Sequence, residues 1–388
     1  MFTHAVIHYG EIGIKGKNRP FFERKLADNI RLALKGVKYQ DLRRIPGRLL
    51  LTLSADSPLP EIEQKLQRVF GINYFSLAVN VSHDLAKIRA VALALVSEEK
   101  PKSIRVLTKR ANKQFPLDSL ALNKDIGQHL LNHLPVVVDL IDADLSLWLE
   151  IVNKYCLVYT KKVDGLKGLP VGVSGKVLCL LSGGINSPVA AWLMMKRGCT
   201  VDFVHFYNDA INSKESLRKI KDLASLLSSY QKTTTLYLVP FRDLQYALIK
   251  SARSEYRMLL YKRLMYRVAA AVAEKARAKA LVSGDNIARV SSRVLPHLEL
   301  IWKASSLILL SPVITYDKQE IVNLSQKIGA YEISTRQYGD CCSFMIAERP
   351  VLDARLPFIE KMEAGCDVKP LVKKALREVT VHSFDQKK

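Results

Sequence analysis

The sequence lacks any long apolar run, and its first residues lack the pattern of a secretion signal. No segment of the 388 residues approaches the ~20 apolar residues of a membrane-spanning helix. Residues 1–13 have no basic stretch followed by a long apolar one, which argues against a signal peptide. These absences predict a cytoplasmic protein with no membrane partner.

Cysteine is scarce and scattered. The chain has six cysteines, at positions 156, 179, 199, 341, 342 and 366. This number and spacing do not suit a disulfide framework, and no Cys-x-x-Cys pair points to a metal site. We therefore expect a reduced protein without a metal site built from a side-chain cluster.

Acidic residues are few compared with basic ones. The sequence has 37 Asp and Glu against 59 Lys and Arg, which gives a net charge of +22 at pH 7. A surplus of this size favours a polyanionic partner such as nucleic acid, although a basic protein without such a partner would show it too. Hydrophobic residues make up 48% of the chain, enough for a sizeable core, and the length suggests two or three domains.

Two sequence patterns divide the chain. In the front part, short predicted strands and helices alternate at the spacing of small α+β domains. Residues 164–175 then contain four glycines and one proline, the composition of a linker. Beyond them, apolar strands alternate with longer helices, which predicts an α/β domain with a parallel sheet and helices on both faces. These strands are expected at residues 176–181, 200–206, 234–239, 279–284 and 307–313.

A Ser-Gly-Gly loop, residues 182–184, directly follows the first of these strands and precedes a predicted helix. Glycines let consecutive N–H groups face an anion, and the helix N-terminus adds partial positive charge. Ser187 is predicted to be the N-cap and Pro188 the first helical residue. The loop matches neither GxxxxGKS/T nor GxGxxG. An ordinary tight turn would explain two glycines, but it explains the whole strand–SGGxxSP–helix context less well.

The loop resembles the SGGxDS motif of PP-loop ATP pyrophosphatases, which adenylate a substrate and release pyrophosphate. Asn186 stands where that family has aspartate. A carboxylate there would help to hold Mg²⁺ against the pyrophosphate, so the neutral amide is expected to be a weaker ligand. The sequence therefore predicts that Asn186→Asp raises ATP turnover.

Further motifs make the chain similar to tRNA 4-thiouridine synthetases, also called tRNA sulfurtransferases, up to about residue 362. The motifs follow in family order: GEIGIKGKNRPFFE (10–23), KRANKQFPLDS (109–119), SGGINSPVAAWLMMKRG (182–198), ALVSGD (280–285), DKQEI (317–321) and YGDCCSF (338–344). No rhodanese-like sequence follows them, so the chain resembles the shorter members of the family.

The resemblance implies a domain order and a reaction. The expected order is a ferredoxin-like domain at 1–60, a THUMP domain at 61–165, a linker at 166–175 and a PP-loop domain at 176–388. The implied reaction uses ATP and Mg²⁺ to adenylate the uridine at position 8 of tRNA. A persulfide, loaded by a cysteine desulfurase or another donor, then displaces AMP. Some members also deliver sulfur to the thiazole of thiamine. The sequence does not give the oligomeric state, so a homodimer stays open.

The resemblance also assigns candidate residues in the PP-loop domain. Those expected to act in catalysis are Cys341, Cys342, Asn186 and Lys318. A partly exposed cysteine on a loop can ionise and carry a persulfide, whereas a buried pair would be inert. Lys318 could stabilise charge near the α-phosphate or simply face solvent. Those expected to bind the nucleotide are Leu180, Leu181, Ser182, Gly183, Gly184, Ser187, His205, Phe206, Lys262, Arg263, Gly284 and Arg293.

Some of these assignments have a plainer alternative. His205 and Phe206 would flank the adenine, but both could equally be core residues. Arg263, or its neighbour Lys262, matches a family arginine near the nucleotide. Arg293 stands where the family has a glutamine that contacts the nucleotide, so adenine recognition there is an open question.

Basic residues on predicted loops of the front part are candidates for binding RNA phosphates. The candidate set is Lys15, Lys17, Asn18, Arg19, Lys109, Arg110, Lys113 and Phe115. Phe115 could stack on an unpaired base of the tRNA 3′ end, or belong to the core. Two other functions stay open: a tRNA-binding protein whose PP-loop has lost catalysis, and another PP-loop enzyme of tRNA modification.

Overall fold

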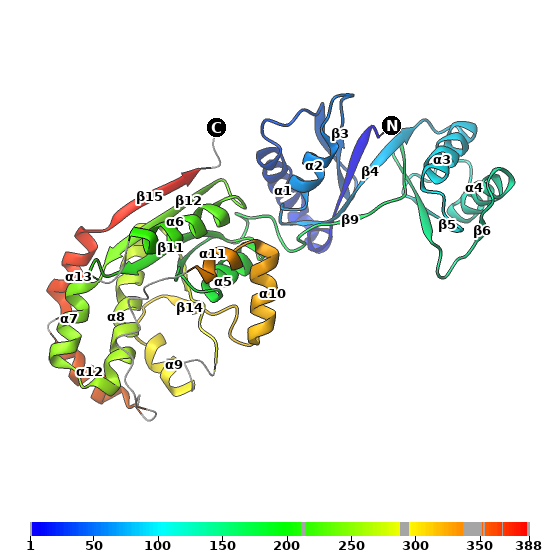
Figure 1. Ribbon diagram of the computed structural model, residues 1–388. Helices are drawn as coiled ribbons and strands as arrows, with labels where there is room; N and C mark the ends of the chain where they lie inside the picture. The colour runs from blue at the N-terminus through cyan, green and yellow to red at the C-terminus, as the bar shows by residue number, and fades with distance from the viewer. Residues whose placement is uncertain are drawn as a thin grey trace. The chain divides into compact units, whose positions relative to one another are not determined.

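The computed structural model forms two compact units, residues 1–170 and 171–388 (Figure 1). Among the described residues, no helix is long and apolar enough to cross a membrane. The residues that the structure describes are 2–210, 214–287, 295–336, 351, 354–366 and 368–385.

The first unit is built on one sheet in the order β2–β3–β1–β4–β8–β7–β5–β6, with β9 paired to β4. Strand β4 joins the two halves of this sheet, because it pairs antiparallel with β1 along its first part and with β8 at its end. The strands are β1 (His4–Tyr9), β2 (Asp41–Ile45), β3 (Arg48–Thr52), β4 (Ile72–Val81), β5 (Ser103–Arg110), β6 (Val137–Val138), β7 (Leu145–Val152), β8 (Tyr155–Tyr159) and β9 (Val163–Asp164).

Four α-helices pack on the same face of this sheet. Side chains such as Ile7 and Phe75 form one core with α1 and α2, and side chains such as Leu149 form a second core with α3 and α4. Asp84 and Asp118 accept hydrogen bonds from the first backbone N–H groups of α3 and α4, as N-caps do. The helices are α1 (Arg19–Ala33), α2 (Leu59–Leu66), α3 (Leu85–Glu99) and α4 (Ser119–His133), with 3-10 turns at Glu11–Ile14 and Gly16–Asn18.

The second unit is a mostly parallel α/β domain with strand order β14–β13–β10–β11–β12–β15. Neighbouring strands pair in parallel except β15, which is antiparallel to β12. The strands are β10 (Lys176–Leu180), β11 (Thr200–Tyr207), β12 (Thr233–Pro240), β13 (Ala280–Val282), β14 (Ile308–Leu310) and β15 (Thr380–Asp385). The fold class predicted from the sequence is confirmed.

Helices cover both faces of the second sheet (Figure 1). One layer holds α5 (Asn186–Lys196), α6 (Lys214–Ser228), α10 (Lys318–Ile328) and α11 (Tyr331–Thr335). The other holds α7 (Arg242–Ser251), α8 (Ser254–Lys275), α9 (Leu295–Trp302), α12 (Leu356–Ala364) and α13 (Val368–Arg377).

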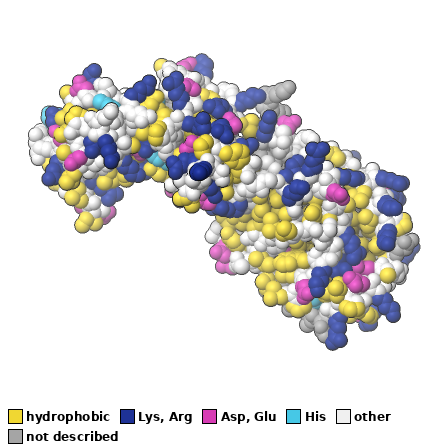
Figure 2. Space-filling model, turned by 180° about the vertical axis from the view of Figure 1, so that it is seen from behind, with side chains coloured by type: hydrophobic (Ala, Val, Ile, Leu, Met, Phe, Trp, Pro, Cys, Tyr) yellow, Lys and Arg dark blue, Asp and Glu magenta, His cyan; other side chains and the backbone are white. Residues whose placement is uncertain are grey.

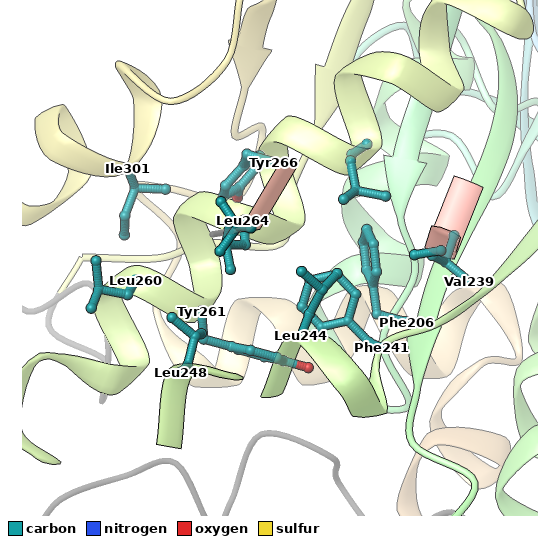
Figure 3. Packing of buried hydrophobic residues seen from close by; sticks show 14 of the residues in the cluster. Phe206, Val239, Phe241, Leu244, Leu248, Leu260, Tyr261, Leu264, Tyr266 and Ile301 are labelled. Carbon is teal, nitrogen blue, oxygen red and sulfur yellow. The ribbon is translucent and has the colours of Figure 1, made fainter. Parts of the chain in front are cut away.

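An aromatic cluster fills the core under α7 and α8 (Figure 3). The ring of Phe241 meets Phe206 edge-on at 4.9 Å and Tyr261 edge-on at 5.2 Å between centroids. Edge-to-face pairs of this kind are favourable beyond the burial of their area. The carboxyl ends of β11 and β12 are therefore held firmly beside the predicted nucleotide site.

Candidate functional site

The Ser-Gly-Gly loop lies where the sequence placed it, between β10 and α5, but the helix begins differently. Ile185, rather than Ser187, occupies the N-cap position, and α5 begins at Asn186. Ser187 is instead the second helical residue, and its hydroxyl accepts a hydrogen bond from the N–H of Ser182 at 2.8 Å. The two serine hydroxyls lie 3.0 Å apart. The predicted N-cap was therefore wrong, because this hydroxyl closes the loop rather than capping the helix.

Hydrogen bonds fix the Ser-Gly-Gly loop, and two of its three residues are exposed. The N–H of Leu181 donates to the carbonyl of Val204 on β11, at 2.9 Å. Ser182 and Gly184 are exposed, whereas Gly183 and Ser187 are buried. The N–H of Gly184 lies 3.3 Å from the Ser182 hydroxyl, so the loop's own serines hold its backbone in place. A fixed loop before a helix N-terminus is suited to anion binding.

Gly284, at the end of β13, lies directly against the start of α5. A Cβ atom at this position would lie 2.8 Å from the backbone nitrogen of Ser187 and 3.0 Å from the carbonyl carbon of Asn186. Only glycine allows this approach, because backbone atoms cannot move aside as the end of a side chain can. The loop and the end of β13 therefore form one wall of the site.

Asn186 connects these two segments. Its Nδ2 donates a hydrogen bond to the carbonyl oxygen of Gly284, at 3.1 Å. An aspartate cannot donate this bond, and its carboxylate would face a carbonyl oxygen. The structure thus gives the amide a role that was not visible in the sequence.

We now expect Asn186→Asp to lower ATP turnover, which reverses the expectation from sequence. Loss of this partly buried hydrogen bond costs about 1 kcal/mol, which corresponds to an adenylation rate about fivefold lower. Pyrophosphate exchange by Asn186→Asp and by Asn186→Ala measures the effect. Both variants should lose activity to a similar degree. Faster exchange by Asn186→Asp would show that the missing negative charge matters more than the bond to Gly284.

The residues after Gly284 form a polar network with α8. Asp285 accepts a hydrogen bond from Lys262 at 2.8 Å and another from the Tyr266 hydroxyl at 2.6 Å. Burial disfavours the carboxylate, but Lys262 and the hydrogen bonds outweigh it and lower the pKa of Asp285 to about 2. Asp285 is therefore a carboxylate at neutral pH and is held beside Lys262 at the end of β13.

Asn286 connects this network to the turn before α10. Its Nδ2 donates to the carbonyl oxygens of Val313 and Tyr316, at 2.8 and 2.5 Å. Lys318 is the first residue of α10, is exposed, and lies between the two residues of a capping box, Asp317 and Glu320. Helix α10 packs against α5, the helix that follows the Ser-Gly-Gly loop. Lys318 therefore begins a helix of the same layer as α5.

Arg263 lies in the interior. Its side chain is 1% exposed and forms an ion pair with Glu363, with Nε–Oε1 at 2.7 Å, and it also donates to the carbonyl of Leu300. A buried arginine paired in this way is expensive to detach. Of the two adjacent candidates, Lys262 is the one that the structure brings to the segment after Gly284, through Asp285.

The two residues predicted to flank the adenine are both buried. His205 has its Nδ1 2.8 Å from the carbonyl oxygen of Leu181, and Phe206 belongs to the aromatic core (Figure 3). Leu181 is buried and Leu180 is half-buried. The structure thus places His205 beside Leu181, the residue just before the Ser-Gly-Gly loop. Phe206 is a core residue.

Three predicted residues, Cys341, Cys342 and Arg293, lie outside the described residues. Arg336 is the last described residue before Cys341. Two side chains of α6 bind the chain at this point. Lys219 donates to the carbonyl oxygens of Ser334 and Arg336, both at 2.8 Å, and Asp222 pairs with the Arg336 guanidinium at 2.6 Å. The sequence analysis missed Lys219, since a lysine inside an amphipathic helix resembles any surface lysine.

The candidate RNA-binding residues of the first unit divide into two groups. Arg19 and Arg110 donate to nearby backbone carbonyls, and Phe115 is buried in the core under α3 and α4. Lys15 lies 5.3 Å from the ring centre of Phe22. The exposed members are Lys17, Asn18, Lys109 and Lys113. Figure 2 shows dark blue Lys and Arg side chains spread over both units, with fewer acidic ones.

The described residues contain no group of three or more His, Cys, Asp or Glu side chains that could hold a metal ion. Cys156, Cys179, Cys199 and Cys366 are free and buried. Burial raises the pKa of the Cys156 thiol to about 12, so it is not a nucleophile at neutral pH.

Sequence families cover both units. Residues 4–76 match the ThiI ferredoxin-like domain and residues 82–161 match the THUMP domain. Residues 172–368 match the family described as Thiamine biosynthesis protein (ThiI).

Known proteins resemble the chain along its whole length. It is 37% identical over 385 residues to a probable tRNA sulfurtransferase of Brevibacillus brevis, covering 98% of this chain and 96% of the relative. It is 36% identical to a probable tRNA sulfurtransferase of Moorella thermoacetica, covering 98% of this chain and 97% of the relative. A crystal structure of a 4-thiouridine synthetase–RNA complex with bound ATP superposes with a TM-score of 0.89 at 31% identity, covering 99% of this chain and 100% of that one.

Proposed function

Because this chain belongs to the ThiI family of tRNA sulfurtransferases, we propose that it converts a uridine of tRNA to 4-thiouridine with ATP. The uridine at position 8 is the proposed target. The observation that carries the proposal is the fixed Ser-Gly-Gly loop beside Gly284, in a chain that is similar over its full length to a synthetase with RNA and ATP bound.

In the first step, O4 of the uracil attacks the α-phosphorus of ATP and pyrophosphate leaves. The Ser-Gly-Gly loop and the N-terminus of α5 hold the leaving pyrophosphate. Lys318 stabilises the charge that develops near the α-phosphate. Lys262, held by Asp285, places a further ammonium donor at the end of β13.

In the second step, sulfur replaces the activated oxygen. The terminal sulfur of a persulfide on Cys341 attacks C4 of the uridine, and AMP leaves with the former carbonyl oxygen. A second thiol, from Cys342 or from a free thiol, then attacks the Cys341 sulfur. This attack breaks the S–S bond, leaves 4-thiouridine on the tRNA and forms a disulfide that must be reduced.

Magnesium fits the site as a partner of the ATP phosphates. Mg²⁺ keeps several waters and uses few protein ligands, so a side-chain cluster is not required. The Nδ2 of Asn186 faces Gly284, which leaves its Oδ1 to bind the cation. When bound, the cation would supply positive charge that neutralises the pyrophosphate.

We further propose a sulfur donor and a second use of the sulfur. A cysteine desulfurase would load the persulfide on Cys341, and the same sulfur could supply the thiazole of thiamine. The description of the matching family as a thiamine biosynthesis protein supports the second role. A homodimer stays a prediction.

The alternative is a tRNA-binding protein whose PP-loop no longer catalyses. ATP/[³²P]pyrophosphate exchange with unmodified tRNA separates the two functions, since it reports adenylation without sulfur. Exchange that depends on tRNA is expected. Tight tRNA binding with no exchange would support the binding protein instead.

A further inference from the structure

Lys219 is a buried lysine on a helix whose other buried residues are apolar or small. It lies on α6 in the same stripe as Ile220 and Leu223, and it is 3% exposed. Burial and the nearby Arg336 lower the pKa of Lys219 below the usual lysine value. A buried ammonium is unfavourable unless it is well bonded, and an apolar side chain of similar length would cost less free energy. Packing alone therefore does not explain a lysine at this position.

The ammonium group of Lys219 binds the end of α11. Its Nζ donates to the carbonyl oxygens of Ser334 and Arg336, both at 2.8 Å. The last carbonyls of a helix have no partner within the helix, and a cation there also meets the negative end of the helix dipole. Both bonds go to main-chain atoms, so Lys219 fixes the path of the backbone where α11 ends.

A second side chain of α6 holds the same segment. Asp222 pairs with the guanidinium of Arg336 at 2.6 Å. Both of these side chains are partly exposed, so their ion pair contributes little by itself. Helix α11 also packs against α6. The buried bonds of Lys219 are therefore the main polar contact that α6 makes with residues 334–336 in the described part of the chain.

The segment bound by α6 leads to Cys341. Arg336 has the extended backbone angles φ −55° and ψ 147°, so α11 ends there. Cys341 follows five residues later in the sequence, and five residues of fully extended chain span at most about 18 Å. Because α6 fixes Arg336, the Cα atom of Cys341 stays within that distance of a fixed point of the domain. Releasing the end of α11 would lengthen the tether and lower the local concentration of the thiol.

We propose that Lys219 is a positioning residue for sulfur transfer, which fixes the end of α11 and thereby keeps Cys341 near the adenylated uridine. The proposal rests on the proposed function and concerns only its second step. In that step a bond forms between C4 and the terminal persulfide sulfur, and the bond from C4 to the oxygen that leaves with AMP breaks. The first step uses no thiol, so adenylation should not depend on the end of α11.

A lysine that only stabilised the domain would give a different result. Its loss would lower adenylation and sulfur transfer together. Methionine has a similar length and suits a buried helix face, so Lys219→Met should fold and melt within about 5 °C of the wild type. This variant removes the two bonds to α11 while it keeps the packing of α6.

The test measures the two steps separately in the full chain. A cysteine desulfurase and cysteine first load the persulfide, and mass spectrometry gives the loaded fraction. After removal of the desulfurase, unmodified tRNA, ATP and Mg²⁺ start a single turnover. In Lys219→Met, the rate constant of 4-thiouridine formation per loaded chain should fall about 10-fold. Pyrophosphate exchange that depends on tRNA should stay within about twofold of the wild type.

Lys221→Met is the matched control, because it makes the same change two positions along α6 at a half-exposed residue. It should transfer sulfur at about the wild-type rate. Equal transfer rates of Lys219→Met and Lys221→Met would overturn the inference, and so would a parallel fall of exchange and transfer in Lys219→Met.

Asp222→Asn keeps the inference testable if Lys219→Met does not fold, since it weakens the same anchor from its exposed side. Transfer about twofold slower with unchanged exchange would support the role of the anchor, and unchanged transfer would overturn it. A wild-type chain that binds tRNA but forms no 4-thiouridine would refute the proposed function itself, which distinguishes the two failures.

Discussion

Replacing Gly284 with alanine is expected to reduce tRNA-dependent adenylation by about 10- to 100-fold. The added methyl would lie 2.8 Å from the backbone nitrogen of Ser187, so β13 and α5 must separate. Forcing an extra carbon into packed backbone costs about 1–3 kcal/mol, and here the strain falls on the loop that holds the pyrophosphate. Pyrophosphate exchange measures the loss.

Two controls show that the effect is local. tRNA binding by Gly284→Ala should be unchanged, because the proposed RNA contacts lie in residues 2–170. Gly365→Ala should keep normal exchange, since its Cβ would meet an atom no closer than 3.5 Å. Normal exchange in Gly284→Ala would mean that the contact between β13 and α5 does not shape the nucleotide site.

Replacing Cys341 with serine is expected to abolish thiolation while leaving adenylation intact. A hydroxyl cannot carry a persulfide, whereas the attack of the uracil oxygen on ATP needs no thiol. Adenylation of the tRNA, measured by pyrophosphate exchange, should persist at about the wild-type rate. The amount of 4-thiouridine should fall below detection. This separation is the largest effect that the proposed mechanism predicts.

Two further serine variants show which thiol acts. Cys366→Ser should leave thiolation near normal, because Cys366 is buried beside Ser251, where its sulfur lies 2.7 Å from the hydroxyl oxygen. Cys342→Ser should slow repeated turnover if Cys342 is the second thiol, and leave it unchanged if a free thiol acts. Thiolation by Cys341→Ser would contradict the assignment of the persulfide to this residue.

The sequence predicted the second unit well because its signals are local. An apolar strand, a glycine loop and a helix follow one another within residues 176–196, so pattern alone places the loop at the strand end. β15 was missed because it is an edge strand whose residues are mostly exposed. No alternation of apolar and polar residues marks it.

The sequence could not separate the roles of Lys262 and Arg263, because these roles depend on the direction of each side chain and on distant partners. Lys262 and Arg263 are adjacent on α8 and point about 100° apart around the helix. Since α8 has charged residues at several positions around its axis and is buried over much of its length, its sequence pattern does not show which one faces the interior. Likewise, Glu150 meets Arg48 only through the register of strands that are far apart in the chain.

The central claim is ATP-dependent thiolation of a tRNA uridine, and analysis of tRNA nucleosides by mass spectrometry tests it most directly. Unmodified tRNA would be incubated with the full chain, ATP, Mg²⁺, a cysteine desulfurase, cysteine and a reductant, then digested. The account predicts 4-thiouridine at position 8, formed only when ATP is present. Recovery of unmodified uridine there, under conditions in which the chain binds tRNA, would contradict it.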